Sequence, residues 1–297
     1  MITIAHTIRL LAPFSHGTID IADAGNVSLL RRFARVHGDE IVRVPGLSAG
    51  ALRGIVRRLL WREVFDLVGL SRETWPGPGS WDRLYAALAN GGTIEAAETR
   101  VSPDAIRASR AALPVLSLLG SALYSSHMAG RAKVSNSLLI CVEAGTGERT
   151  CWDYVVEETR VRHADREEQD PEASGVGPMP TTVEVLIEGA TLRGRAVVGG
   201  ALEASAWAHG LDRITHLGGK SGQGFGAVEV LHDGNPAFYR AWLEAHIDDL
   251  RAALLKLAGE LGAGKARKKP QRLRNDTVSA STPTEETTVA AEPELPL

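Results

Sequence analysis

The clearest hydrophobic pattern in this sequence is a helical one that begins just after Pro45. Apolar residues recur at positions 52, 55, 56, 59, 60, 64, 67 and 68, which is the i, i+3, i+4, i+7 spacing of a helix with one buried face. Ser48 precedes this run and can cap its first N–H groups. Arg53, Arg57 and Arg58 fall outside the apolar stripe. The pattern therefore predicts a helix that starts at Ser48 and carries arginines off its buried face.

Shorter apolar runs predict the strands. Residues 2–11 are rich in β-branched and apolar side chains and stop before Pro13, which indicates a first strand. Two runs on either side of a Gly-Thr-Gly turn are predicted to pair as a hairpin. Residues 15–39 contain scattered glycines and show weak periodicity, so they predict a loop. The predicted strands are residues 2–11, 41–44, 136–143, 150–156, 182–188 and 225–231.

Helical patterns and a charged stretch fill most of the remainder. Ala-rich pieces after the breaker WPGPGSW predict a helical insertion, and a charged stretch without a burial pattern predicts a projecting arm. The further predicted helices are residues 81–89, 103–112, 115–123, 201–216 and 236–261. The predicted segments are a core of residues 1–70, 132–156 and 181–235, an insertion at 71–131, an arm at 157–180, a C-terminal helix at 236–262 and a disordered tail at 263–297.

The order of these elements predicts an α+β fold. Without the insertions it is strand, helix, strand, strand, helix, strand, which is the ferredoxin-like βαββαβ order of RNA-recognition domains, here with a helical insertion and a thumb-like β-hairpin arm. Phe and Tyr are scarce on the predicted strands. Base stacking on the sheet face is therefore not expected.

Composition narrows the class of protein. A chain of 297 residues with 44% hydrophobic content can bury a substantial core. Neither a signal peptide nor a membrane-spanning run is recognisable, so we expect a cytoplasmic protein. With only Cys141 and Cys151, a cysteine-built zinc site is unsupported, and structural thiols are favoured over a hairpin disulfide. No cofactor is expected.

Charge is unevenly distributed. The net charge is −3. The segment from residue 31 to residue 62, however, contains eight arginines and two acidic residues, so its local net charge is 8 − 2 = +6. Guanidinium groups suit bidentate phosphate contacts, although a solvated helix face and an arginine-rich loop would give the same pattern. Those arginines are at positions 31, 32, 35, 43, 53, 57, 58 and 62, and the acids are Asp39 and Glu40.

The glycine-rich segment LGGKSGQGFG at 217–226 resembles two nucleotide-binding motifs but matches neither. A Walker A loop requires Gly where Ile214 stands and a helix afterwards, whereas a strand is predicted here. The dinucleotide fingerprint must follow a strand and open a helix, and this segment does the reverse. Two interpretations remain: a loop whose backbone approaches phosphates, helped by Lys220, Ser221 and Gln223, or tight packing against the first helix.

Two motifs in this order resemble a known superfamily. The first is Pro45, Gly46, Ser48, Arg53 and Gly54 at a helix start, and the second is Gly222, Gly224 and Gly226. Together they resemble the RAMP superfamily of CRISPR systems over residues 2–231, and the charged arm stands where backbone subunits, the seventh Cas family, have a thumb-like hairpin. General resemblance of the arginine-rich region favours a type IV effector, with type III second.

The resemblance implies a non-catalytic backbone subunit that oligomerises along guide RNA (crRNA) and binds its sugar-phosphate backbone. Base pairing then selects the target DNA or RNA. The implied partners are guide RNA, target, further copies of the chain, a large subunit and a capping RAMP subunit, without a membrane. Charge reversal at Arg53 and Arg57 should abolish RNA retention while the fold stays intact. The predicted RNA-binding residues are Arg31, Arg32, Arg35, Ser48, Arg53, Arg57, Arg160, Arg162, His163, Gly219, Lys220, Ser221, Gln223 and Phe225.

Two other classes of function stay open. An endoribonuclease could use Asp20 or Asp23 with a metal ion, although Asp in a Gly- and Asn-containing loop is commonly a turn residue. Guide-RNA processing would need a general base, and only His216 borders a binding motif, while His16 and His37 are expected to be solvated loop residues. The third class is an assembly protein without nucleic acid.

Overall fold

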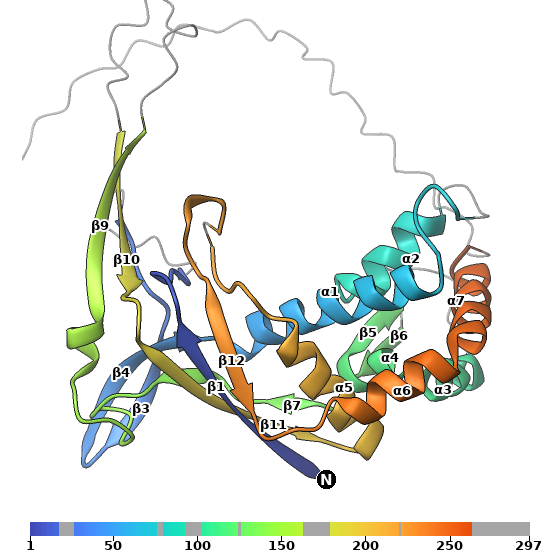
Figure 1. Ribbon diagram of the computed structural model, residues 1–297, viewed down its shortest axis with the longest axis horizontal. Coiled ribbons are helices and arrows are strands. Elements are labelled where there is room, and N and C mark those ends of the chain that lie inside the picture. Colours follow the sequence, from blue (N-terminus) through green and yellow to red (C-terminus); the bar gives the residue numbers. More distant parts are fainter. Residues whose placement is uncertain are drawn as a thin grey trace, which may run out of the picture. The chain divides into compact units, whose positions relative to one another are not determined.

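The computed structural model describes residues 1–17, 27–75, 80–92, 102–123, 126–162, 179–219 and 221–262. Within them the protein is α+β, with an antiparallel sheet and seven α-helices (Figure 1). None of the helices in this part of the chain is both long and apolar enough to cross a membrane. The predicted α+β class is therefore confirmed.

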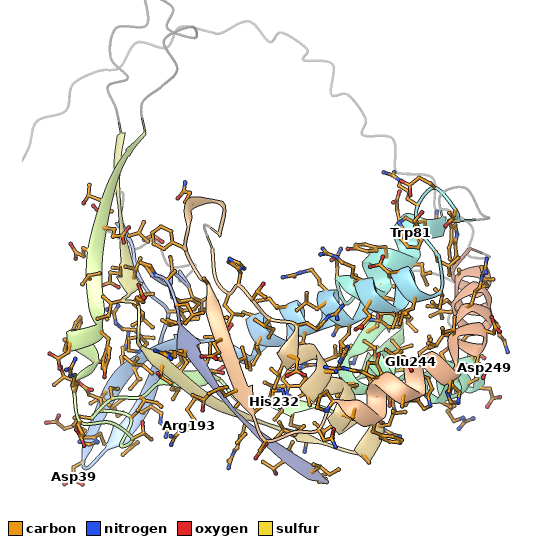
Figure 2. All side chains as sticks on the ribbon, in the orientation of Figure 1. Asp39, Trp81, Arg193, His232, Glu244 and Asp249 are labelled. Atoms are coloured by element: carbon orange, nitrogen blue, oxygen red, sulfur yellow. The ribbon has the colours of Figure 1, made fainter. Side chains whose placement is uncertain are left out.

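The main sheet is centred on β1 (Ile2–Leu10), which is antiparallel to β11 (Thr191–Val198) on one side and to β12 (Val228–His232) on the other. The strand order is β12-β1-β11-β8-β4-β3, and β7 also pairs with β11. The further strands are β3 (Arg32–His37), β4 (Glu40–Leu47), β7 (Lys133–Val134) and β8 (Ser137–Leu139). Asp39 marks the turn between β3 and β4, and His232 ends β12 (Figure 2).

In the two central strands, β1 and β11, buried and exposed side chains alternate, so that each strand buries one face. In β1 the side chains of Ile4, Ile8 and Leu10 are buried, and in β11 those of Leu192 and Ala196. This period of two is what a sheet with one covered face requires. The sequence interpretation missed β11, although its alternation is present, because arginines and a glycine interrupt the apolar run.

Helix α1 (Ala49–Leu67) confirms the prediction from the apolar stripe. Ser48 is its N-cap, and the Ser48 side chain accepts a hydrogen bond from the backbone N–H of Ala51. Helix α5 (Ala201–Asp212) contacts β1, β11 and β12 as well as α1, α4 and α6. Because it has neighbours on all sides, every residue from 204 to 211 is buried.

The insertion between α1 and β7 contains a small hairpin in addition to helices. The predicted helix at 115–123 ends early, because Gly120 has φ +68° and lies against the backbone of Met128, where any side chain would overlap. The elements are α2 (Ser80–Ala89), α3 (Pro103–Ala112), α4 (Pro114–Leu119), β5 (Gly120–Leu123) and β6 (Ser126–Ala129).

The C-terminal helical region is two helices where the sequence predicts one. Helix α6 (Ala237–Ala245) and helix α7 (Ile247–Gly262) are separated at His246, whose φ of −126° is not helical. Helix α7 contacts α2 and α3 of the insertion. The break therefore redirects the chain so that its second apolar stripe covers the insertion.

Strands β9 (Val155–Arg162) and β10 (Met179–Leu186) run side by side and antiparallel, from Leu186 opposite Val155 to Met179 opposite Arg162 (Figure 1). Strand β2 (Val27–Ser28) pairs with β10 in parallel. The middle of the predicted arm, residues 163–178, lies outside the described residues.

Two local predictions are wrong. Residues 32–37 form β3 and not a loop, because their backbone pairs with β4 although their side chains are largely exposed. The predicted hairpin of 136–143 with 150–156 does not form: β8 pairs with β11 and β4, and Cys151–Tyr154 is a 3-10 helix capped by Thr150 and Asp153. Both cysteines are free and buried, as expected of structural thiols.

Candidate nucleic-acid interface

Residues 13–17, which follow β1, hold the two predicted motifs next to each other. The carbonyl oxygen of Ser15 accepts a hydrogen bond from the N–H of Gly219 at 2.9 Å, and that of Pro13 accepts one from Gly226 at 2.8 Å. The next residue, His16, has its Nε2 atom 3.3 Å from both the backbone N and the Oγ of Ser48. The start of α1 and the glycine-rich segment therefore pack against one short piece of chain.

The first turn of α1 is partly satisfied by side chains. Ser48 Oγ accepts the Ala51 N–H at 3.2 Å, and Asn136 Oδ1 accepts the Ala49 N–H at 2.9 Å. Gly50 lies between Ala49 and Ala51 in this turn and is exposed. Since a helix N-terminus carries partial positive charge, this turn can bind a phosphate oxygen.

The glycine-rich segment contains two kinds of glycine: some that close packing requires and some whose backbone is open. Gly218 and Gly226 have φ of +81° and +78°, and a Cβ on them would lie 2.3 Å from the Ser15 oxygen and 2.0 Å from the Leu217 oxygen. These two glycines are thus needed for packing. Gly219 and Gly222 have open space where a Cβ would stand, so their backbone is accessible to a ligand.

Phe225 is part of the protein interior. Its side chain is 2% exposed and forms a small apolar cluster with Val183 and Val185 of β10. The ring is therefore not free to stack on a base, contrary to the prediction that it contacts RNA. It instead fixes the glycine-rich segment against β10. Ser221 and Gln223 bound the short 3-10 helix η3 just before it.

Arg31 and Arg35 remain available as cations. Arg31 donates its backbone N–H to the His16 carbonyl at 2.8 Å, so its side chain starts beside the Ser48 site, and Arg35 is exposed on β3. Neither guanidinium makes a hydrogen bond or an ion pair with the described residues. Burial, and secondly the charge of Arg31, lower the pKa of His16 below its ordinary value. His16 is thus half-buried and neutral at pH 7, and not a solvated loop residue.

Arg32, in contrast, is occupied inside the protein. Its guanidinium forms a two-pronged ion pair with Glu184, with N–O distances of 2.8 and 3.0 Å, and lies over the Trp152 ring. The side chains are only 15% and 10% exposed. Burial opposes ionisation of Glu184, but hydrogen bonds from Arg32 and the Leu30 N–H outweigh it and keep the Glu184 pKa low. The pair joins β3 to β10, so Arg32 is a structural residue here.

Arg53 and Arg57 are also bound internally. Both donate to the carbonyl oxygen of Leu119, at 3.0 and 2.8 Å, and Arg57 also donates to that of Gly120 at 2.6 Å. These carbonyls end α4, where the helix dipole favours cations. Burial and then the neighbouring Arg53 lower the pKa of Arg57 to about 10. The two arginines line a cavity of about 230 Å³ that also includes His127.

The remaining predicted residues are placed only in part. Arg160 and Arg162 lie on β9 opposite Thr181 and Met179, which gives their register and no more. Among the described residues, no group of three or more His, Cys, Asp or Glu side chains could hold a metal ion. His163, Lys220, Asp20 and Asp23 lie outside the described residues.

Sequence reasoning missed His16 and Asn136 as supports of the α1 start. They are 32 and 87 residues from their contacts at Ser48 and Ala49. A local pattern cannot report such a pairing, because it depends on how β1 and β8 are arranged in the sheet.

Among the comparisons with known proteins, only the one with solved structures gave matches. No protein-family model matches the sequence, and no curated protein matches it. A chain of a solved structure described as a Type IV-B CRISPR complex has a TM-score of 0.55 at 19% identity, over 78% of this chain and 90% of that chain. A chain of a Type III-B Cmr-beta complex bound to cognate target RNA has a TM-score of 0.46 at 12% identity, over 78% of this chain and 60% of that chain. The fold of this protein is thus similar to that of a chain of a type IV-B CRISPR complex.

Proposed function

We propose that this protein is a backbone subunit of a class 1 CRISPR ribonucleoprotein effector, in which copies assemble along guide RNA and bind its sugar-phosphate backbone. The observation that carries this proposal is the meeting of the α1 start and the glycine-rich segment on Ser15 and His16. The fold similarity to a chain of a type IV-B complex supports it independently.

The finer fold assignment is part of the proposal. Strands β12-β1-β11-β8, with α1 in the connection from β1 to β8 and α5 in that from β11 to β12, fit the ferredoxin-like order of RNA-recognition domains. The antiparallel strands β9 and β10 fit the base of a thumb-like arm that would insert between nucleotides.

The proposed contacts are sequence-independent. Backbone N–H groups at Gly50 and Gly222 meet phosphate oxygens, and the guanidinium groups of Arg31 and Arg35 supply the positive charge. Gly219 donates its N–H to Ser15 and contributes only an open backbone surface that lets the RNA come close. Arg32, Arg53 and Arg57 instead hold the framework, because internal acceptors already occupy them. Target choice is left to base pairing with the guide. The subunit itself is proposed to be non-catalytic and to work in the cytoplasm.

Co-purification tests the proposal. The protein is co-expressed with a repeat array, and the length of its bound RNA and the size of the assembly are measured. Short RNA of defined length in a multimer is expected, and its amount should fall sharply in Arg31→Glu/Arg35→Glu. Arg72→Glu is the matched control, since Arg72 is exposed and follows the C-terminal end of α1, whereas the interface is at its start. An absorbance ratio of pure protein, or RNA content unaffected by Arg31→Glu/Arg35→Glu, would contradict the proposal.

The non-catalytic part has its own test. Metal-dependent cleavage of guide-complementary RNA that disappears in Asp20→Ala/Asp23→Ala would show an endoribonuclease instead. We expect no such cleavage.

The arm is tested by a hairpin replacement. Because Arg162 and Met179 are paired, residues 163–178 can be replaced by an Asn-Gly turn without changing the register of β9 and β10. We expect normal folding but an altered nuclease footprint on the bound RNA. Identical footprints with and without residues 163–178 would rule out the thumb role.

A further inference from the structure

A second cavity, of about 430 Å³, lies away from the proposed guide-RNA interface, between α3, α4 and the start of α5. Arg107 and Arg110 of α3, Arg131 after β6 and Glu203 of α5 line it. Three guanidinium groups facing one carboxylate leave a balance of 3 − 1 = +2 on its walls. A cavity with that balance attracts anions.

The single acid is already neutralised within the protein. Glu203 Oε1 accepts hydrogen bonds from Ser117 Oγ at 3.1 Å and from Arg131 Nη1 at 3.2 Å. Arg107 pairs with Asp104 one turn away on the same helix, but both side chains are at least 75% exposed. Such an exposed pair is weak and yields readily to a ligand. The excess positive charge in the cavity is therefore carried by Arg107 and Arg110.

The Arg110 guanidinium is held in a fixed position at the wall of the cavity. Its Nη2 donates to the Ala129 carbonyl at 2.6 Å, which fixes the guanidinium in place. Its Nε is buried and has no hydrogen-bond partner within the described part of the chain. The cavity therefore holds a fixed cation at Arg110, whose positive charge attracts an anion, while its buried Nε is not itself a contact atom.

The rest of the cavity suits more than a bare ion. Pro114 and Leu202 add apolar surface beside the arginines. The volume lies within the range of small-molecule sites, large enough for a sugar and a base next to a phosphate. Helix α5 starts here without a side-chain cap, and this adds partial positive charge at the same place.

We propose that this cavity binds the phosphate group of a nucleotide unit, at a site separate from the interface at Ser48 and Gly219. Helix α5 begins just after Val198, which pairs with Ile2 at the start of β1, whereas the glycine-rich segment adjoins Leu11 beyond its end. The nine residues of β1 span about 30 Å between these levels. The site does not depend on the guide-RNA function. Its phosphate belongs either to a free nucleotide or to a nucleic-acid strand.

The test uses the full chain freed of RNA by nuclease and high salt. Binding of adenosine monophosphate is measured by calorimetry, and binding of a fluorescent 12-nucleotide RNA by anisotropy. Arg107→Gln should weaken binding about fivefold, the size of one partly exposed ion pair. Arg72→Gln is the matched control, because the Arg72 side chain is 72% exposed, close to the 75% of Arg107, is likewise paired with an Asp, and lies outside the cavity.

A variant that is expected to tighten binding provides a control, because loss of folding could only weaken binding. Glu203→Gln keeps an acceptor for Ser117 and Arg131 but removes the negative charge, so it should tighten binding severalfold. Weakening by Arg107→Gln with tightening by Glu203→Gln supports the proposal. If adenosine monophosphate shows this pattern, the source is a free nucleotide, and if only the RNA shows it, the source is a strand.

Two results would overturn the site. One is that neither ligand responds to Arg107→Gln and Glu203→Gln. The other is that Arg107→Gln and Arg72→Gln have equal effects, which would indicate nonspecific charge. RNA binding that depends on Arg31 and Arg35 but not on Arg107 would reject the cavity while leaving the proposed function intact.

Discussion

The His16 side chain is hydrogen-bonded to Ser48 at the start of α1: the His16 Nε2 atom lies 3.3 Å from both the backbone N and the Oγ of Ser48. The contact requires an unprotonated Nε2, since it accepts the Ser48 N–H. It connects the segment after β1 to the first turn of the arginine-bearing helix. The geometry of the proposed interface therefore depends on the charge state of one histidine.

The first prediction concerns the titration of His16. Because burial and then the charge of Arg31 disfavour the imidazolium, its pKa should lie below the ordinary value of 6.5. Histidine NMR resonances followed from pH 8 to 4 measure it, with His16→Asn to assign the signal. Arg31→Gln should move the midpoint upward. A His16 midpoint at or above 6.5 would contradict the buried, neutral state.

The second prediction is a loss of stability in acid caused by His6. Its Nε2 lies 2.8 Å from Ser137 Oγ in a buried contact. Burial, and secondly the charge of the nearby His232, lowers the His6 pKa to about 4. Between pH 6.5 and about 4, His6 is therefore protonated in the unfolded chain but not in the folded chain. Stability from this group is complete above the unfolded value of 6.5 and is lost as pH falls toward 4.

The size of this effect is about 1.4 kcal/mol per pH unit within that window. Denaturant unfolding at a series of pH values measures it, and the slope attributable to His6 should vanish in His6→Gln. Identical pH slopes for the wild type and His6→Gln would show that His6 is not the responsible group.

The third prediction assigns Arg32 to the framework. Arg32→Met leaves the buried Glu184 carboxylate without its partner and should cost about 3 to 5 kcal/mol of unfolding free energy. Arg32→Met/Glu184→Met should recover most of that loss, whereas Arg35→Met, on the exposed part of β3, should change stability little. Denaturant midpoints report all three. Equal effects of Arg32→Met and Arg35→Met would mean that the ion pair does not hold β3 to β10.

The fourth prediction separates packing glycines from accessible ones. Gly226→Ala places a Cβ against the Leu217 carbonyl at positive φ and should cost about 2 kcal/mol or more. Gly222→Ala meets open space and should change stability by less than about 0.5 kcal/mol while reducing RNA retention. Thermal unfolding and RNA content are measured on the same preparations. The assignment fails if Gly222→Ala unfolds as readily as Gly226→Ala.

The fifth prediction revises what the sequence suggests for the α1 arginines. The sequence predicts that charge reversal at Arg53 and Arg57 spares the fold, whereas in the structure both guanidinium groups donate to the carbonyl at the end of α4. Arg57→Met should therefore cost about 2 kcal/mol of stability, because it removes two charge-assisted hydrogen bonds. Arg58→Met, one position along and exposed, is the control and should lie within about 0.5 kcal/mol of wild type. Unfolding free energies that do not differ would refute this assignment.

Much of the fold could be predicted because its helices and strands have local hydrophobic patterns in the sequence. The apolar stripe from Leu52 to Val68 predicted α1, the Ala-rich helical pattern of residues 103–112 predicted α3, and the β-branched and apolar run of residues 2–11 predicted β1. The failures have a common cause. Strand β3 buries few side chains and is defined by hydrogen bonds to β4, and α4 stops at Gly120 because of a neighbour eight residues on. Neither feature leaves a periodic pattern.

From residue patterns one can predict an α+β protein with an arginine-bearing helix and a late glycine-rich segment. Only the packed structure reveals which of those arginines are held by partners within the protein. A guanidinium looks the same in sequence whether it meets solvent, as in Arg35, or a buried carboxylate, as in Arg32. That outcome depends on acceptors supplied by residues far along the chain, at Glu184 and Leu119, because burial and hydrogen bonding are properties of the packed molecule.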